Sequence, residues 1–278
     1  MIALHEINRT SETYGVPLET IEKDYMISWI LACISRTSLV KNFAFYGGTA
    51  VKQIYFKDHR YSEDIDLISA KGFDADFLTQ SLLNSFPWAK AKANLDFAID
   101  ARRTLSQGSR TQIFVSFSGF DEIVGSPKEV RIDFALEMGA YGETKERKVL
   151  ENYSDLKGLV TKLQVHSLNT ILAGKLGLLM NSSRKEPRDL FDVWFLLNRT
   201  RQFQFNLQKV RKYFNQKYGF PPGIGVLRPH LRNRLYKERW GTRLAKQIAH
   251  LPSIDSVIRD VEAKLEKIFE HGTSSHTR

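Results

Sequence analysis

The sequence predicts an α/β domain over residues 1–155, followed by a mostly helical and basic domain over residues 156–278. Two patterns carry this prediction. Over residues 96–138 apolar and polar side chains alternate, which is the two-residue period of strands that bury one face. Beyond residues 153–158 the strand patterns fade and helical periods dominate, so we place the domain boundary near residue 156.

The local patterns predict each element in turn. Residues 18–34 are expected to form an amphipathic helix, which Pro17 opens because its fixed φ suits the first helical turn. Apolar runs and alternation predict strands over residues 43–46, 64–68, 112–118 and 130–136. Helical periods predict further helices over residues 49–55, 77–86, 165–180, 188–197 and 256–269.

Composition limits the classes of protein to which the chain can belong. Its 278 residues carry a formal net charge of +10, which favours polyanionic partners such as RNA, DNA or nucleotides. Cys33 is the only cysteine, so no intrachain disulfide can form, which fits a reducing compartment. The N-terminus lacks a basic region followed by an apolar core, and the apolar run 168–180 is too short to cross a bilayer. We therefore expect a soluble, cytoplasmic protein with no membrane partner.

The first candidate site is a glycine turn followed by two carboxylates. Gly47, Gly48 and Thr49 precede a predicted strand that carries Asp64 and Asp66. Because successive side chains of a strand point to opposite faces, these two carboxylates share one face. They repel each other unless a cation lies between them, and Mg²⁺ prefers such oxygen ligands together with substrate phosphates. A glycine turn lets main-chain N–H groups approach a phosphate, so the pattern predicts a site for a metal-bound nucleoside triphosphate.

Asp133 is the candidate for a third carboxylate. On the predicted strand over residues 130–136 the apolar side chains share one face, and Arg131 and Asp133 share the other. Asp133 is therefore expected beside Asp64 and Asp66, or alternatively as an exposed charge that pairs with Arg131. The glycine turn and the two earlier carboxylates also have a structural alternative, because Gly-Gly is common in turns and Asp-x-Asp occurs on exposed strands.

Charged residues in two predicted helices form a second candidate set. Lys175 lies inside an apolar run, and burial of an unpaired ammonium is costly. It therefore needs an anionic partner, which a triphosphate or a carboxylate cluster would supply, or it must reach solvent. Asp189 near the start of the next helix is explained by the helix dipole. Asp192 lies one turn after Arg188 and either pairs with it or belongs to the site.

The second half of the chain is strongly basic. Between Arg199 and Gln247 there are thirteen Lys or Arg residues against one acid, Glu238. Aromatic residues are interleaved with them, which suits contact with a nucleic-acid backbone and its unstacked bases. The alternative is a solvated cationic helical face whose aromatic residues belong to the core.

The motifs, in their order, resemble those of the AbiEii/AbiGii family of nucleotidyltransferase toxins, within the DNA polymerase β-like nucleotidyltransferase superfamily, and those of the related mycobacterial MenT toxins. The most specific match runs from the two glycines to Asp64-Ile65-Asp66-Leu67, and the chain beyond residue 200 matches only loosely. The matching motifs are Glu22-Lys23-Asp24-Tyr25, Phe45-Tyr46-Gly47-Gly48-Thr49-Ala50, Arg60-Tyr61-Ser62-Glu63-Asp64-Ile65-Asp66-Leu67, Ile132-Asp133-Phe134, Lys175 in its apolar helix, and Arg188-Asp189-Leu190-Phe191-Asp192.

The resemblance implies a polymerase β-like α/β domain with a mixed sheet, followed by a helical domain. It implies transfer of a nucleotide from an NTP with Mg²⁺ or Mn²⁺ as cofactor. The implied acceptor is RNA, in particular the 3′ end of tRNA, so that translation stops, and the implied protein partner is a cognate antitoxin. Two alternatives remain open, namely transfer of a nucleotide to a protein, and a nucleotide-binding or antitoxin-binding module without turnover.

The resemblance also implies roles for residues of the first domain. Asp64 and Asp66 match the metal ligands of the family, and Gly48, Thr49 and Ser62 match positions near the phosphates. The expected mechanism adds Gly47 to the phosphate-binding turn. It also assigns Asp133 either to a second metal or to deprotonation of the attacking 3′-hydroxyl.

In the second domain the resemblance concerns three charged residues. Lys175 matches the family lysine and is expected to hold the phosphate tail. Asp192 matches the acid of the last motif. Arg188 stands where the family often has lysine, which keeps the positive charge but changes its hydrogen-bonding geometry.

Overall fold

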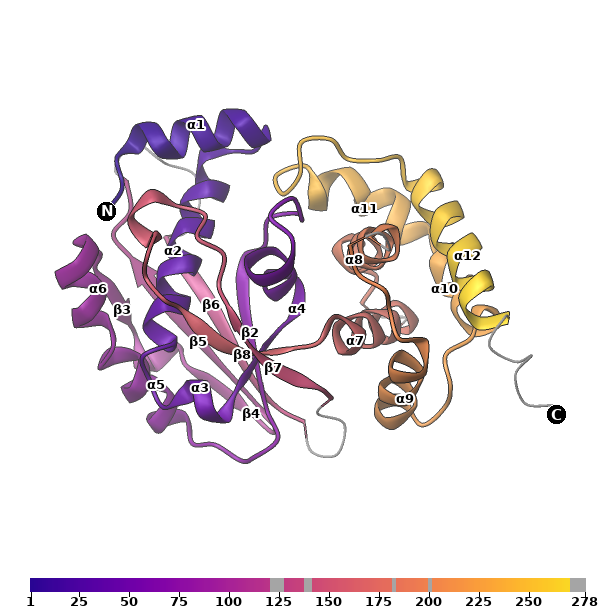
Figure 1. Cartoon of the computed structure of the whole chain (residues 1–278), viewed down its shortest axis with the longest axis horizontal. Coiled ribbons are helices and arrows are strands. Elements are labelled where there is room, and N and C mark those ends of the chain that lie inside the picture. The colour runs from indigo at the N-terminus through magenta and orange to yellow at the C-terminus, as the bar shows by residue number, and fades with distance from the viewer. Residues whose placement is uncertain (121–127, 138–141, 182–183, 200–201, 271–278) are drawn as a thin grey trace. The chain divides into compact units, whose positions relative to one another are not determined.

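The computed structural model describes all residues except 121–127, 138–141, 182–183, 200–201 and 271–278 (Figure 1). The chain divides into two compact units. The sheet unit comprises Met1–His166 together with Lys246–Ala249, and the helical unit comprises Ser167–Ala245 together with His250–Arg278.

Strand β8 (Lys162–His166) extends the sheet unit past the predicted boundary after residue 155. It belongs to the sheet because its Val165 pairs in parallel with Phe45 of β1 (Ala44–Tyr46). The sequence pattern assigned residues 165–166 to a helix, but helix α7 begins only at Leu168, where the Ser167 side chain accepts a hydrogen bond from the main-chain N–H of Thr170. Val165, Leu168 and Leu172 recur at helical spacing across this cap, so the apolar period alone did not separate strand from helix.

A single mixed sheet forms the core of the sheet unit. Its order is β3-β5-β6-β2-β1-β8-β7, and β4 pairs with β5 outside this path. The β2–β6 and β1–β8 pairs are parallel, and the other pairs are antiparallel. The predicted strands are confirmed. The remaining strands are β2 (Asp64–Ser69), β3 (Phe97–Ile99), β4 (Leu105–Gln107), β5 (Arg110–Phe117), β6 (Glu129–Leu136) and β7 (Thr144–Lys148).

The two faces of β6 have different environments. Val130, Ile132 and Phe134 are fully buried on one face, where helix α2 packs against the strand (Figure 1). Arg131 and Asp133 alternate with them and lie half-exposed on the opposite face. The period-two pattern of the sequence therefore separates an apolar core from a polar sheet face.

Helix α2 (Leu18–Ile34) has the predicted limits but is not amphipathic. Every residue from Tyr25 to Ile34 is buried, so the helix is enclosed on all sides. Apolar residues lie on all sides of an enclosed helix, so some of them also stand at the spacing of a single apolar face. The sequence pattern therefore indicated an amphipathic helix. Two acids of this helix, Glu22 and Asp24, are nevertheless buried.

Smaller helices complete the sheet unit. The predicted helix over residues 49–55 begins two residues earlier, as α4 (Gly47–Ala50), and continues as a π-helix, η1 (Val51–Tyr55). The predicted helix over residues 77–86 is instead two helices, because Asn84 ends the first and Pro87 lies in the first turn of the second. The other helical elements are α1 (Leu4–Tyr14), α3 (Leu39–Asn42), α5 (Ala75–Leu83), α6 (Phe86–Ala93), η2 (Ala101–Arg103) and η3 (Ser154–Leu156).

A late segment of the chain also belongs to the sheet unit. The main-chain oxygen of Gln247 accepts a hydrogen bond from the N–H of Tyr61 (3.0 Å). Its side-chain oxygen accepts from Nη1 of the buried Arg60 (2.9 Å), and its Nε2 donates to Glu63 (3.2 Å). Residues 246–249 thereby hold the loop that leads into β2.

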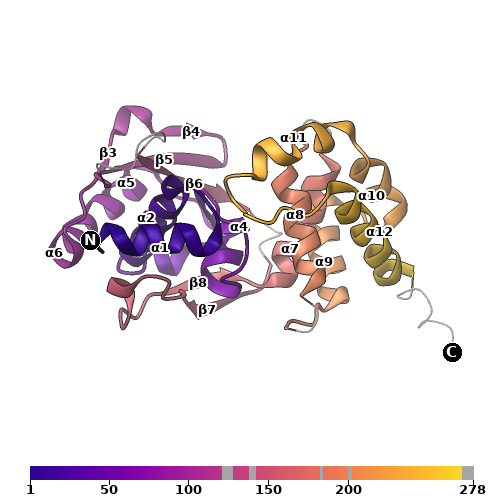
Figure 2. The ribbon, with the colours of Figure 1, turned by 90° about the horizontal axis from the view of Figure 1, so that it is seen from above.

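Helices α7 to α12 form the helical unit (Figure 2). Helix α7 is buried along most of its length, and Tyr218 of α9 packs so closely on its Gly177 that a β-carbon there would lie 1.9 Å from the ring. None of the helices in the described part of the chain has the length and apolar character needed to cross a bilayer. The helices are α7 (Leu168–Met180), α8 (Pro187–Asn198), α9 (Leu207–Tyr218), α10 (Ile224–Leu231), α11 (Arg234–Leu244) and α12 (Ile254–Glu270).

Candidate active site

The polar face of the sheet brings together the three carboxylates that the sequence singled out. Asp64 and Asp66 lie two residues apart on β2 and therefore on the same face. Strand β6 runs parallel to β2, in a register that places Arg131 opposite Asp64 and Asp133 opposite Asp66. Neighbouring strands are about 4.8 Å apart, so the Asp66 and Asp133 side chains are neighbours on this face.

The glycine turn lies directly beside this face. Tyr46 pairs with Asp66 across β1 and β2, and the next residue, Gly47, has a φ of +81°. A β-carbon at Gly47 would lie 2.2 Å from Oδ2 of Asp66. Position 47 therefore requires glycine for two reasons, its left-handed φ and the carboxylate that occupies the space of a side chain.

Thr49 and Ser62 both lie near the start of strand β2. The Thr49 side chain is buried, and its hydroxyl donates a hydrogen bond to the main-chain oxygen of Asp64. This bond ties the helix after the glycine turn to the strand that carries the carboxylates. Ser62 is largely buried in the loop before β2. The predicted phosphate contacts of both residues remain predictions.

Arg131 bridges two of the carboxylates. Its Nη2 lies 2.5 Å from Oδ2 of Asp64, and its Nε lies 2.9 Å from Oδ2 of Asp133. The other Asp133 oxygen accepts a hydrogen bond from Nε2 of Gln112 on β5 (2.6 Å). Burial alone would lower the pKa of Arg131, but the adjacent acids outweigh it and raise that pKa, so the guanidinium stays charged. The pairing of Asp133 with Arg131 that the sequence left as an alternative is thus present on the same face as the three carboxylates.

The donor atoms of this face suit a divalent cation. The oxygens of Asp64, Asp66 and Asp133 are hard ligands of the kind that Mg²⁺ and Mn²⁺ take. Among the residues that the structure describes, no three acidic, His or Cys side chains are already arranged as a metal cage. Arg131 lies between Asp64 and Asp133, so its guanidinium contacts oxygens that a metal would use.

A buried network supports the helix that follows the glycine turn. Nε2 of Gln53 in η1 donates to Oδ1 of Asp24 on α2 (2.7 Å), and the Tyr153 hydroxyl donates to the other Asp24 oxygen (2.8 Å). Burial raises the pKa of Asp24, although Lys52, Tyr153 and Gln53 act in the opposite direction. The Glu-Lys-Asp-Tyr motif thus contributes a buried acid that fixes the helix adjoining the site.

Glu22, the first acid of that motif, makes a second internal contact. Its carboxylate accepts hydrogen bonds from the main-chain N–H of Phe120 (2.7 Å) and from Nζ of Lys128 (2.6 and 2.7 Å). A β-carbon at Gly119 would lie 2.1 Å from Oε1 of Glu22. The sequence pattern gave the motif no role of its own, because these partners are about a hundred residues away in the chain.

The second candidate set lies in the helical unit. Nζ of Lys175 is 2.7 Å from Oδ1 of Asp189 and 2.7 Å from Oδ2 of Asp192. Nε of Arg184 lies 3.0 Å from the other Asp189 oxygen. The Lys175, Asp189 and Asp192 side chains are 7%, 2% and 0% exposed. A carboxylate cluster therefore supplies the anionic partner that Lys175 requires, and Asp192 has a partner on α7. Phosphate binding by Lys175 and a site role for Arg188 remain predictions.

The basic region of the second half is partly neutralised within the helical unit. Acids of α12 pair with its cations, as in Arg232–Glu262 (2.8 Å) and Lys237–Asp255 (2.8 Å). Within α11, Arg234 pairs with Glu238 (2.8 Å). Phe214, Tyr236 and Trp240 are buried, as expected if the aromatic residues of this region belong to the core. Arg243 of α11 and Lys212 lie on exposed or half-exposed surface.

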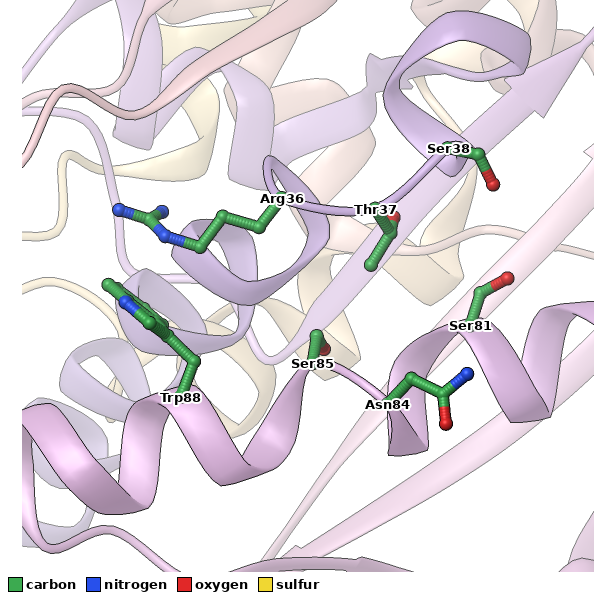
Figure 3. A pocket seen from close by; sticks show the side chains of 7 residues that line it. All are labelled: Arg36, Thr37, Ser38, Ser81, Asn84, Ser85 and Trp88. Carbon is green, nitrogen blue, oxygen red and sulfur yellow. The ribbon is translucent and has the colours of Figure 1, made fainter.

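A pocket of about 360 Å³ lies in the sheet unit and involves none of the predicted site residues. Its polar lining comes from the turn between α2 and α3, from α5 and from the turn that leads into α6 (Figure 3). The Arg36 guanidinium lies 3.5 Å from the centre of the Trp88 ring and donates to the main-chain oxygen of Ala32 (2.7 Å). The Arg36 guanidinium therefore already has interaction partners within the protein, and the pocket needs no ligand to explain it. The lining residues are Arg36, Thr37, Ser38, Ser81, Asn84, Ser85 and Trp88.

The fold is that of nucleotidyltransferase toxins. The nucleotidyltransferase toxin MenT4 from Mycobacterium tuberculosis H37Rv matches with a TM-score of 0.64 at 14% sequence identity, over 96% of this chain and 90% of that chain. JHP933 from Helicobacter pylori matches with a TM-score of 0.57 at 15% identity, over 91% of this chain and 93% of that chain. At such identities the likeness concerns the fold and carries no residue roles.

The sequence itself assigns the family. Residues 29–267 match the family model described as nucleotidyl transferase AbiEii toxin, type IV TA system. The chain therefore belongs to the AbiEii family and is a nucleotidyltransferase toxin, as the resemblance of its motifs implied. Membership implies a nucleotide substrate and an antitoxin partner. A search of the curated proteins finds no match.

Proposed function

We propose that this toxin transfers a nucleotide from an NTP to the 3′-hydroxyl of an RNA, in particular the 3′ end of tRNA, with Mg²⁺ or Mn²⁺ as cofactor, and so inhibits translation. The observation that carries the proposal is the shared polar face of Asp64, Asp66 and Asp133 next to the Gly47 turn. Hard carboxylate oxygens beside a glycine turn suit a nucleoside triphosphate with its metal.

In this proposal each residue of the face has a distinct task. Asp64 and Asp66 would hold the divalent ion. Asp133 would either join them, in which case solvent takes the proton of the attacking 3′-hydroxyl, or accept that proton itself. The main-chain N–H groups of the Gly47-Gly48 turn bind phosphate oxygens. The 3′-oxygen attacks the α-phosphorus in line, the new phosphodiester bond forms as the bond to pyrophosphate breaks, and pyrophosphate leaves with the electron pair. A bound divalent ion would neutralise the charge that develops on the phosphoryl oxygens.

The net charge of +10 supports RNA as the acceptor, since a cationic protein attracts the phosphate backbone. Several cations of the helical unit are paired with acids of α12, which leaves fewer free charges than the sequence count suggests. We therefore expect the affinity for RNA to depend moderately on salt concentration. The metal for nucleotidyl transfer is expected at the sheet face alone.

The test is incubation of the purified full chain with tRNA and each α-labelled NTP in the presence of Mg²⁺. We expect label in tRNA with at least one NTP, and a loss of roughly 100-fold or more in Asp64→Ala, because one carboxylate ligand is gone. Asp76→Ala is the matched control, since it removes an exposed acid of α5 and should leave the rate unchanged. Absence of transfer by the wild type with every NTP would refute the proposal, and label in the protein instead of the RNA would replace the acceptor.

A further inference from the structure

We propose that Arg131 is a built-in counter-ion of the carboxylate face, which holds Asp64 and Asp133 until a divalent cation takes their oxygens. The inference rests on the proposed function, because it assumes that the metal binds at this face. It adds a residue that sets the affinity and order of metal binding. In the metal-free chain the guanidinium balances part of the charge, and metal binding requires it to leave at least one carboxylate.

The geometry of the bridge supports direct competition. The planar guanidinium uses two of its nitrogens, Nη2 on Asp64 and Nε on Asp133 (2.5 and 2.9 Å). Because Gln112 donates to the second oxygen of Asp133 (2.6 Å), both oxygens of that carboxylate already have donors. A metal bound at Asp133 would lie within a few ångströms of the guanidinium, and the repulsion between the two positive charges favours departure of Arg131. Arginine is the stronger competitor of the two donors, since it is charged whereas the glutamine amide is neutral.

The exposure of the three side chains makes the exchange possible. The Arg131 side chain is 37% exposed, whereas those of Asp64 and Asp133 are 17% and 22% exposed. The carboxylates are thus fixed and partly enclosed, and the long arginine arm reaches solvent. An arginine that releases a carboxylate here can point its charge into water, which costs little free energy compared with release inside a core.

The charge balance explains why the chain would carry such a residue. Without a cation, Asp64, Asp66 and Asp133 would place three negative charges side by side on neighbouring strands. Like charges at this spacing either repel or take up a proton. Arg131 offsets one of these charges through its contacts with Asp64 and Asp133, and the face that remains is net negative and still attracts a divalent ion.

The experiment measures metal binding in the full chain without NTP or RNA, so that turnover plays no part. Mn²⁺ is titrated into wild type and variants, and free Mn²⁺ is followed by electron paramagnetic resonance. We expect Arg131→Gln to bind Mn²⁺ about tenfold more tightly or better, since a competing charge a few ångströms from the ion is removed. Arg131→Lys should lie between it and the wild type, because one ammonium replaces the two-armed fork.

Arg103→Gln is the matched control. Arg103 pairs with Glu129 of β6 (2.7 Å) and lies over the Phe114 ring, but it makes no ion pair with Asp64 or Asp133 among the described contacts. The same charge is removed from a neighbouring position, so its Mn²⁺ affinity should change by about twofold or less. Circular dichroism and thermal unfolding with and without Mn²⁺ establish that each variant is folded, and Mn²⁺ should raise the melting temperature of Arg131→Gln more than that of the wild type.

The outcomes separate this inference from the proposed function. If Asp64→Asn abolishes Mn²⁺ binding while Arg131→Gln binds as the wild type does, or more weakly, the metal site stands and the counter-ion role is refuted. If no variant binds Mn²⁺, with or without Arg131, both the proposed metal site and this inference fail.

Discussion

The carboxylate of Asp66 occupies the space that a side chain at position 47 would need. Gly47 has a φ of +81°, and a β-carbon built there would lie 2.2 Å from Oδ2 of Asp66. The glycine turn and the carboxylate strand are therefore one packed unit. A change in the turn should act on the carboxylate before it affects the rest of the fold.

We expect Gly47→Ala to reduce nucleotidyl transfer by roughly 100-fold, as loss of a residue that orients a metal ligand typically does. The added methyl group must displace the Asp66 carboxylate or shift the turn. Gly158→Ala is the control, because Gly158 has a φ of +78° and no atom within 4 Å of the built β-carbon. Both variants should lose about 1–2 kcal/mol of stability from the left-handed φ. Equal activity of the two variants would show that the contact with Asp66 is not needed.

Lys175→Met should destabilise the helical unit by about 3–5 kcal/mol, because it leaves two buried carboxylates without their shared cation. Asp189 and Asp192 each lie 2.7 Å from the ammonium and are almost fully buried. The free energy of unfolding from urea titrations measures the effect. Arg184→Met is the comparison, since its side chain is 40% exposed and its ion pair is with one of the two carboxylates, Asp189, so its cost should be clearly smaller. A Lys175→Met loss below about 1 kcal/mol would contradict a stabilising role of the ion pairs.

Acidification should weaken the same cluster. Burial alone would raise the pKa of Asp189, but Lys175 and Arg184 outweigh it and hold the pKa below its usual range. A carboxyl whose pKa is lower in the folded state stabilises the fold above its unfolded pKa and loses this contribution as pH falls through the folded pKa. The stability difference between wild type and Asp189→Asn should therefore be constant near neutral pH and shrink below about pH 4. Urea titrations at several pH values give this difference, and a difference that grows on acidification would reverse the assigned sign.

Gln53→Leu should cost about 1–3 kcal/mol, since it removes a hydrogen-bond donor from the buried carboxylate of Asp24. Gln53 is fully buried, and its side-chain oxygen also accepts from Asn152 (3.3 Å). Gln80→Leu replaces an exposed glutamine of α5 by the same residue and should change stability by about 0.5 kcal/mol or less. Thermal and urea unfolding compare the two. Similar losses in both variants would mean that Gln53 does not support the helix after the glycine turn.

Local patterns in the sequence were sufficient for the strands that carry the site. The alternation around Ile65 and Ile132 separates core from polar face within a few residues, so the facing of Asp64, Asp66 and Asp133 could be predicted. Strand β8 could not be separated in this way. Its Val165 stands at helical spacing from Leu168 of α7, and its pairing with β1 joins segments more than a hundred residues apart.

The ion-pair partners of most charged residues could not be predicted from the sequence. That Arg131 bridges Asp64 as well as Asp133 depends on the register of two parallel strands, which no local pattern encodes. In the same way, the excess of cations before Gln247 suggested a free basic face. The acids that neutralise part of it, such as Glu262, belong to α12 and lie outside that stretch of sequence.

The return of Gln247 to the loop before β2 makes the helical residues 167–245 an insertion in the chain of the sheet unit. A gene product that stops at residue 166 would contain all the strands of the sheet that the structure describes and all three acids of the face, yet lack the acceptor that Gln247 supplies to the buried Arg60. We therefore expect premature stop codons before position 246 to yield inactive fragments rather than minimal toxins. Because the intact product is harmful to its own cell, a single nonsense mutation anywhere before position 246 would be enough to abolish toxicity.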